Sequence, residues 1–191
     1  YFEDYSDTAL GDIPSSAEMN GDAEVVEIAG EKWLKTGDGT QMTLNIPKTE
    51  EDLTLEFEIK ARQVDSSYQF SLRFINEEKE YESWVDVAGY YVSWGGNFGE
   101  KSLPGNSTEK RFYTNDETAR VSVSFQKKSA KVYINRILAM NVTGFSPVMP
   151  RMIRFTASVP SEDGAFAAIK NIRIASEIPL IARELQEKGK Y

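Results

Sequence analysis

Paired carboxylates are the first candidates for chemistry in this sequence, because Glu56 and Glu58 stand two residues apart in the alternating segment 53–61. A period of two turns the apolar residues of that segment toward a core and both glutamates toward the opposite face. Glycoside hydrolysis needs two carboxyl groups placed across one bond. The next residue on the same face is Lys60 rather than a further acid. We therefore interpret the pair as solvated strand charge and expect no enzyme activity.

A second candidate is an aromatic and polar surface on a predicted hairpin. Residues 84–87 and 90–94 alternate on either side of Ala88-Gly89, which predicts a two-residue turn. The core face would then hold Val85, Val87, Tyr90, Val92 and Trp94. The outer face would hold Trp84, Asp86, Tyr91 and Ser93, with Ser71 and Arg73 of the preceding strand nearby. Aromatic rings pack against the apolar side of a sugar, and polar neighbours orient it by hydrogen bonding, so this face predicts a glycan-binding surface.

The alternative is that Trp84 and Tyr91 are covered, either by the N-terminal residues or by segment 95–116, which we predict to be a long surface loop. Leaving large side chains exposed gives up burial worth ~1.5–3 kcal/mol each, so an exposed cluster would need a functional reason. A covered face would favour a structural or protein-interaction module. We expect Trp33 and Trp94 to lie in the core.

Composition excludes several functions. The chain has no cysteine and no histidine, which removes disulfides, thiolate nucleophiles, imidazole bases and most transition-metal sites. The formal net charge of −8 argues against a nucleic-acid surface, because phosphate binding needs clustered Lys and Arg. No apolar run approaches the ~20 residues that cross a bilayer, so we expect no direct membrane insertion.

The remaining sequence predicts strands that would position these residues. Roughly ten to thirteen short alternating segments follow one another with turn signals between them and no helices. The clearest pair is 121–126 and 131–135, joined by a short polar link at 127–130. We therefore predict an all-β, two-sheet antiparallel jelly-roll sandwich over residues 1–176. Apolar residues at helical spacing in 177–191 predict a short C-terminal helix.

Three segments carry a family resemblance. The run RVSVSFQKKSAKVYIN at 120–135 precedes a closing strand, AIKNIRI, at 168–174, and the chain opens with FEDY at 2–5. Together they resemble the concanavalin A-like lectin/glucanase sandwiches, including laminin G-like domains. The resemblance implies a concanavalin A-like fold. The glucanases of this class carry a third acid in an E-x-D-x-x-E strand, which is missing here.

Some sandwiches of this class carry calcium at a loop edge, so the resemblance leaves structural calcium as an alternative to a module without a cofactor. Ca²⁺ takes six to eight oxygen ligands. The available oxygens belong to Asp4, Asp7, Asp38, Asp163 and Asn171. No compact D-x-D-x-D loop joins them, and we assign no residue to a metal.

A second resemblance concerns the context of the domain. The opening through residues 21–26 and the ending 183–191 look like the N-terminal region of Bacteroidetes envelope proteins of the OmpA family. Those proteins continue into a peptidoglycan-binding domain. The resemblance implies the periplasm or the outer membrane and cell surface of a Gram-negative bacterium, with 177–191 as a helical linker toward that missing domain. We expect a non-catalytic envelope module whose partner is a glycan or another envelope protein.

Overall fold

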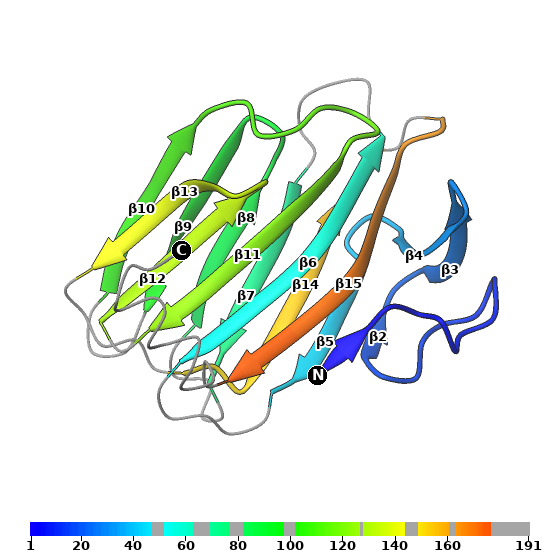
Figure 1. Cartoon of the computed structure of the whole chain (residues 1–191), viewed down its shortest axis with the longest axis horizontal. Helices are drawn as coiled ribbons and strands as arrows, with labels where there is room; N and C mark the ends of the chain where they lie inside the picture. The colour runs from blue at the N-terminus through cyan, green and yellow to red at the C-terminus, as the bar shows by residue number, and fades with distance from the viewer. Residues whose placement is uncertain are drawn as a thin grey trace, which may run out of the picture.

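The computed structural model describes residues 1–46, 52–62, 69–76, 82–97, 102–126, 128–143, 149–160 and 163–176. Two antiparallel sheets lie face to face (Figure 1), which confirms the predicted all-β sandwich of jelly-roll type. No helix within these ranges is long and apolar enough to cross a membrane. The predicted C-terminal helix at 177–191 lies outside the described residues.

The two sheets hold fifteen strands in the described part of the chain. Sheet A has the order β13-β12-β11-β6-β15-β4-β3, with β1 paired to β15. Its strands are β1 (Phe2–Glu3), β3 (Ala23–Ile28), β4 (Glu31–Thr36), β6 (Leu53–Arg62), β11 (Thr118–Gln126), β12 (Ser129–Ile134), β13 (Ile137–Thr143) and β15 (Phe166–Ser176). Sheet B has the order β10-β9-β8-β7-β14-β5-β2. Its strands are β2 (Glu18–Asn20), β5 (Gln41–Asn45), β7 (Gln69–Ile75), β8 (Glu82–Val87), β9 (Tyr91–Asn97), β10 (Ser102–Glu109) and β14 (Met152–Ser158).

The core lies between the sheets and follows from the alternation of the strands. In β6, every second residue from Leu53 to Ala61 is buried, while those between them are half-buried on the outer side. Phe57 of sheet A meets Phe155 of sheet B edge-on, with ring centroids 5.3 Å apart. Trp94 belongs to this core as predicted. Trp33 is also buried but lies on the outer side of sheet A, beneath Lys170, whose Nζ is 4.5 Å from the ring centroid.

The predicted central hairpin is present with a shorter turn. Ser129 and Ala130 already pair with Gln126 and Phe125, so half of the predicted link at 127–130 belongs to β12. At the other end, the strand stops one residue earlier than predicted.

A two-residue turn explains that early end. Asn135 and Arg136 both have positive φ, of 50° and 66°, between the paired residues Ile134 and Ile137. Two consecutive positive φ values match the twist of a tight hairpin, and asparagine tolerates them better than most residues. The Asn135 side chain also accepts a hydrogen bond from the Arg120 backbone N–H at 2.9 Å, which ties the turn to β11.

The predicted long loop at 95–116 is wrong at its start, where β9 continues to Asn97, and in its middle. Residues 102–109 form β10, which pairs antiparallel with β9 at the edge of sheet B. Pro104 and Gly105 within the strand obscured it in the sequence. An edge strand tolerates proline because one side of it makes no ladder hydrogen bonds, and here the register shifts between Leu103 and Asn106.

Two buried tyrosines are expected to make the fold sensitive to alkaline pH. Burial raises the pKa of Tyr5 and Tyr113 above the usual 10.0, and neither hydroxyl has a hydrogen-bond partner in the described residues. The unfolded chain loses these protons near pH 10 while the folded protein keeps them. Their contribution is therefore complete below about pH 10 and is lost as the pH rises through the folded pKa.

Tyr113→Phe is expected to flatten the fall in Tm as the pH rises above about 10. It should cost little at neutral pH, because it removes a buried hydroxyl that lacks a partner. Thermal unfolding followed by circular dichroism at several pH values measures this. Tyr90→Phe, at an exposed tyrosine, is the matched control. Parallel pH profiles for the wild type and Tyr113→Phe would contradict the prediction.

Candidate functional site

The predicted outer-face residues do share one surface of sheet B. In the strand register, Trp84 of β8 lies opposite Arg73 of β7, and Asp86 lies between Ser71 on one side and Ser93 on the other. All are half-buried, as is Tyr91 where β9 begins. The surface is therefore neither fully exposed nor fully covered by another segment. Each of these side chains keeps part of its surface accessible to solvent.

The turn that joins β8 to β9 differs from the predicted one. Val87 pairs with Val92, and the Ala88 N–H donates to the Tyr91 carbonyl at 2.9 Å, so the turn residues are Gly89 and Tyr90. Tyr90 is therefore 51% exposed instead of buried. The true register differs from the predicted one by two residues. Because faces alternate with a period of two, all the remaining side chains of the hairpin stay on their predicted faces.

A residue that the sequence reasoning missed completes this surface. Arg154 of β14 lies directly opposite Arg73, so two arginines stand side by side next to Trp84. The alternation of β14 could have revealed it, because Ile153 and Phe155 face the core and leave Arg154 on the outer side. What the sequence does not show is that β14 pairs with β7.

We call this surface the Trp84 patch and define it as Ser71, Arg73, Trp84, Asp86, Tyr91, Ser93 and Arg154. The Arg73 guanidinium lies 5.8 Å from the Trp84 ring centroid, which fits a cation–π contact. The Ser93 hydroxyl donates to Asp86 Oδ2 at 3.5 Å, a long hydrogen bond. The pKa of Tyr91 is raised, first by burial and then by the negative charge of Asp86. The phenol therefore stays protonated and can donate a hydrogen bond at neutral pH.

Three polar atoms of the Trp84 patch are buried without any hydrogen-bond partner in the described part of the chain. They are Ser71 Oγ, Asp86 Oδ1 and Arg154 Nε. Buried polar atoms in proteins nearly always have a partner, so each such atom calls for an explanation. Asp86 Oδ1 is an acceptor, Arg154 Nε carries a donor, and the Ser71 hydroxyl can act as either. Together with the Trp84 ring they form a surface that can hydrogen-bond to an additional molecule.

The two glutamates considered for catalysis lie on the other sheet and are engaged in ion pairs. Glu56 pairs with Arg120, and Glu58 lies 3.4 Å from Lys170. Lys170 also pairs with Glu31, which accounts for its almost complete burial. Both carboxylates therefore have cationic partners that hold them on the outer face of sheet A, as the alternation of β6 predicts.

The oxygens considered for calcium are dispersed. Asp4 accepts a hydrogen bond from the Ser6 backbone, and Asp38 accepts one from the Val159 backbone at 2.9 Å. Asn171, with φ at 52°, lies where the β15 register shifts against β6. No group of three or more acidic side chains that could hold a metal occurs within the described ranges. Structural calcium stays a prediction without assigned ligands.

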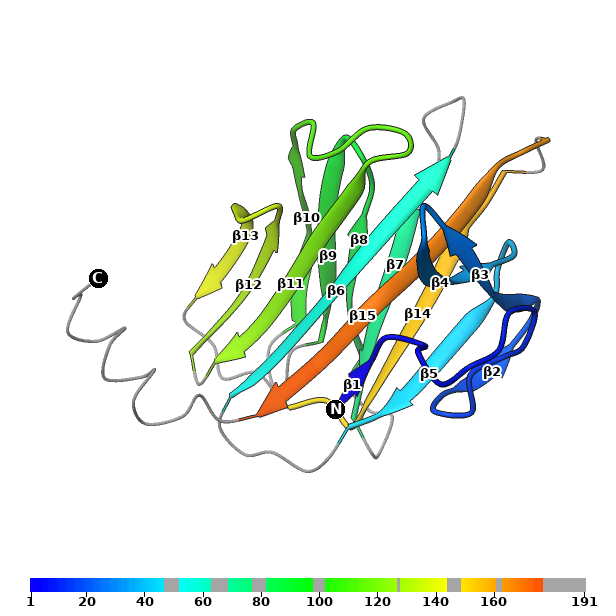
Figure 2. The same ribbon diagram turned by 45° about the vertical axis from the view of Figure 1, so that its right-hand side comes forward.

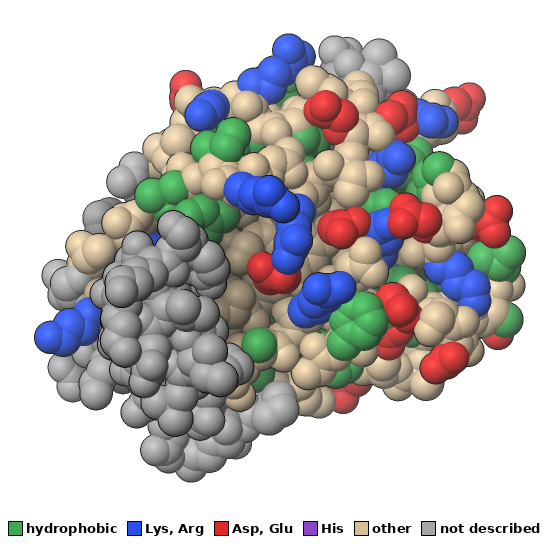
Figure 3. Space-filling view, viewed as in Figure 1, with side chains coloured by type: hydrophobic (Ala, Val, Ile, Leu, Met, Phe, Trp, Pro, Cys, Tyr) green, Lys and Arg blue, Asp and Glu red, His purple; other side chains and the backbone are tan. Residues whose placement is uncertain are grey.

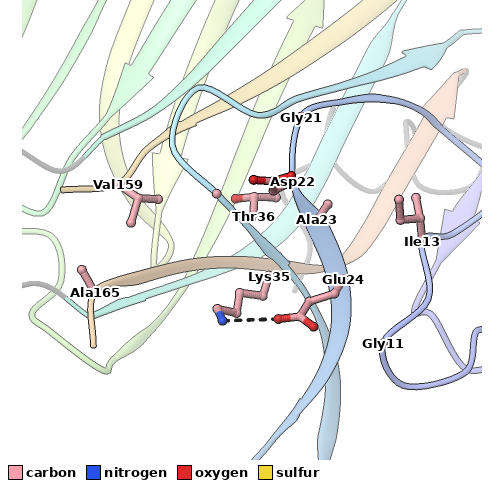
Figure 4. Close-up of a pocket in the computed structure, with 11 residues that line it drawn as sticks. Gly11, Ile13, Gly21, Asp22, Ala23, Glu24, Lys35, Thr36, Val159 and Ala165 are labelled. Atoms are coloured by element: carbon pink, nitrogen blue, oxygen red, sulfur yellow. Dashed lines mark hydrogen bonds and ion pairs between the residues drawn. The ribbon is translucent and has the colours of Figure 1, made fainter. Parts of the chain in front are cut away.

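Two further hollows lie away from the Trp84 patch. One, of about 350 Å³, is on the outer face of sheet A between Glu56, Arg120, Ser122, Tyr133 and Arg136. Figure 3 shows basic side chains gathered on this face. The other, of about 460 Å³, is lined by residues of β3, β4 and the segments around them (Figure 4).

The fold resembles those of botulinum neurotoxin binding domains. The serotype G binding domain has a TM-score of 0.62 and 14% identity, and the match covers 99% of this chain and 51% of that chain. The serotype D binding domain has a TM-score of 0.65 and 13% identity, with 99% and 50% covered. A type C neurotoxin, which depends on interaction with two ganglioside molecules to enter cells, has a TM-score of 0.62 and 14% identity, with 97% and 50% covered.

These likenesses establish the sandwich fold, and this chain spans about half the length of each neurotoxin domain that it matches. No protein-family model matches the chain. No curated protein matches its sequence.

Proposed function

We propose that this chain is a non-catalytic β-sandwich module that binds a glycan through the Trp84 patch. The observation that carries the proposal is the set of three buried polar atoms without partners beside a half-buried tryptophan. An unpaired buried polar atom costs ~1–3 kcal/mol, which a bound hydroxyl or an ordered water recovers. A sugar supplies hydroxyls for Asp86 and Arg154 and an apolar ring face for the indole.

The sheet holds these groups in place before any ligand arrives. Trp84, Arg73 and Arg154 come from three adjacent strands whose pairing fixes their spacing. Side chains on paired strands lose little freedom when a ligand binds, so less of the binding free energy is spent on ordering them. Such preformed groups suit recognition of one face of a saccharide rather than capture of a flexible chain.

Two observations support a binding role over catalysis. Glu56 and Glu58 are held by Arg120 and Lys170 and lie on the sheet opposite the Trp84 patch. The structural neighbours include a neurotoxin binding domain and a type C neurotoxin whose cell entry depends on interaction with gangliosides. The inference from those neighbours is by analogy of fold, and the Trp84 patch is the independent argument from this chain.

The cell-envelope context is a separate part of the proposal. It rests on the resemblance of residues 21–26 and 183–191 to envelope proteins that continue into a peptidoglycan-binding domain. In that setting the sandwich would present its glycan surface in the periplasm or at the cell surface. Reading the coding sequence downstream of Tyr191 tests this, and a downstream domain of another kind would contradict it.

A glycan array followed by isothermal titration calorimetry tests the binding function. The expected result is selective binding of one group of related saccharides, with a Kd below about 1 mM for the best of them. Signals from the patch residues should change on binding in NMR spectra. An array with no reproducible binder, or a binder whose NMR footprint lies outside the Trp84 patch, would overturn the proposal. Retention of an envelope protein by the same patch would favour a protein-interaction module instead.

A further inference from the structure

A second, preformed cavity lies at the end of the molecule that carries the β3–β4 hairpin, which stands apart from β12 and β13 (Figure 2). Its volume is about 460 Å³, within the range of small-molecule sites. The walls come from four stretches that are distant in the sequence (Figure 4). They are Gly11 and Ile13 before β2, Gly21 to Glu24, Lys35 to Gly37, and Val159 with Ala165 between β14 and β15.

Backbone hydrogen bonds fasten these walls to one another. The Gly37 N–H donates to the Asp22 carbonyl at 2.8 Å, and the Gly11 N–H donates to the Val25 carbonyl at 2.9 Å. The side-chain carboxylate of Asp38, which follows Gly37, accepts a hydrogen bond from the Val159 N–H at 2.9 Å and so ties Val159 to the same wall. The cavity is thus a fixed part of the fold and does not depend on a loop closing over it.

A glycine is required in the tightest part of the wall. At Gly21, φ is +114°, and an added Cβ would lie 2.8 Å from Thr40 Oγ1 and 3.0 Å from Thr40 Cα. The Thr40 hydroxyl in turn donates to the Asp22 carbonyl at 2.8 Å. A side chain at position 21 would therefore clash with the backbone of Thr40. Because glycine has no side chain, residues 21 and 40 can pack closely in this wall.

The polar groups of the cavity are suited to a molecule with several hydroxyls. Thr36 is only 8% exposed, and its hydroxyl has no hydrogen-bond partner among the described residues. At the mouth, Glu24 and Lys35 form an exposed ion pair at 3.4 Å, and Figure 4 shows the Asp22 carboxylate beside Thr36. Two carboxylates and one ammonium give the cavity a net negative charge, which disfavours an anionic ligand.

We propose that this cavity binds a single neutral sugar residue, separately from the Trp84 patch. Sugar hydroxyls both donate and accept, so they can donate to Asp22 and Glu24, accept from Lys35 and exchange a hydrogen bond with Thr36. Ile13 and Val159 line opposite ends of the cavity (Figure 4), so the C–H groups of a ring can contact the short apolar surface of one of them. A metal ion is a poorer match, because the described residues hold no group of three acidic ligands.

The test uses the full chain, labelled with ¹⁵N, and four probes: the methyl glycosides of glucose, galactose, mannose and N-acetylglucosamine. We expect at least one of them to shift the amide signals of Gly21, Thr36 and Gly37 saturably. Thr36→Val keeps the shape and removes the hydroxyl, so it is expected to weaken that binding by about tenfold or more. Lys35→Met removes the ammonium donor and is also expected to weaken binding. Because Lys35 is exposed, this substitution should not threaten folding.

Trp84→Ala is the control that separates the two sites, because it should leave binding in this cavity unchanged. The proposal is overturned if none of the four glycosides shifts these amides. It is equally overturned if glucuronate or calcium chloride binds there instead, or if Thr36→Val and Lys35→Met both bind as the wild type does. Failure of the Trp84 patch to bind any glycan would leave a positive result here intact.

Discussion

Trp84→Ala is expected to weaken glycan binding by about 30-fold or more, the effect typical of losing a central aromatic anchor worth at least ~2 kcal/mol. The indole is the largest side chain of the Trp84 patch and lies against the Arg73 guanidinium. Its removal takes away the apolar platform and leaves Arg73 without its ring contact. Calorimetric titration of the saccharide selected on the array, with wild type and variant side by side, measures the loss.

The matched control for this prediction is Tyr90→Ala. Tyr90 is an aromatic residue of the same hairpin, but it stands in the turn, is 51% exposed and contacts Arg111 instead of the patch. Its removal should change the saccharide Kd by less than about twofold. A Trp84→Ala protein that keeps the wild-type melting temperature and the wild-type affinity would rule out the Trp84 patch as the site.

Phe57→Ala is expected to lower the free energy of unfolding by about 3–5 kcal/mol, the largest stability effect that we predict. Phe57 is 1% exposed and meets Phe155 of the opposite sheet with ring planes at 90°. Truncation would lose the transfer free energy of the ring and leave a cavity where the two sheets meet. Urea unfolding followed by tryptophan fluorescence measures the change.

Phe2→Ala makes the same substitution at an exposed position and serves as its control. Phe2 is 52% exposed and lies 5.0 Å from the Arg173 guanidinium on the outer side of β15. Its loss should cost less than about 1 kcal/mol, because little apolar area returns to water. Equal losses for Phe2→Ala and Phe57→Ala would mean that the space between the sheets is not the dominant core.

Along strands with clear alternation, the local pattern of the sequence was enough to predict which side chains face inward. Alternation is a property of neighbouring residues along one strand, so the core side of 53–61 and the outer position of Trp84 follow without any knowledge of pairing. Even the wrong turn at Ala88-Gly89 preserved those faces, because the true register differs from the predicted one by two residues. Composition likewise excluded thiolate and imidazole chemistry from the start.

Segments with weak alternation were predicted poorly. Strand β10 carries Pro104 and glycines nearby, and its pairing with β9 through an irregular register has no local signature. Trp33 is buried as predicted, but it lies on the outer side of sheet A under Lys170 instead of between the sheets. That cover comes from a strand far along the chain.

Only the tertiary structure decided which rows of side chains become neighbours. Arg154 joins the Trp84 patch because β14 pairs with β7, and the partnerless atoms of Ser71, Asp86 and Arg154 are recognisable only once those strands lie together. The second cavity depends even more on long-range assembly, since four distant stretches close it. The sequence by itself determined the two faces of each strand, because that follows from a period of two. The order of the strands, and with it both candidate sites, is set by long-range packing that no local pattern records.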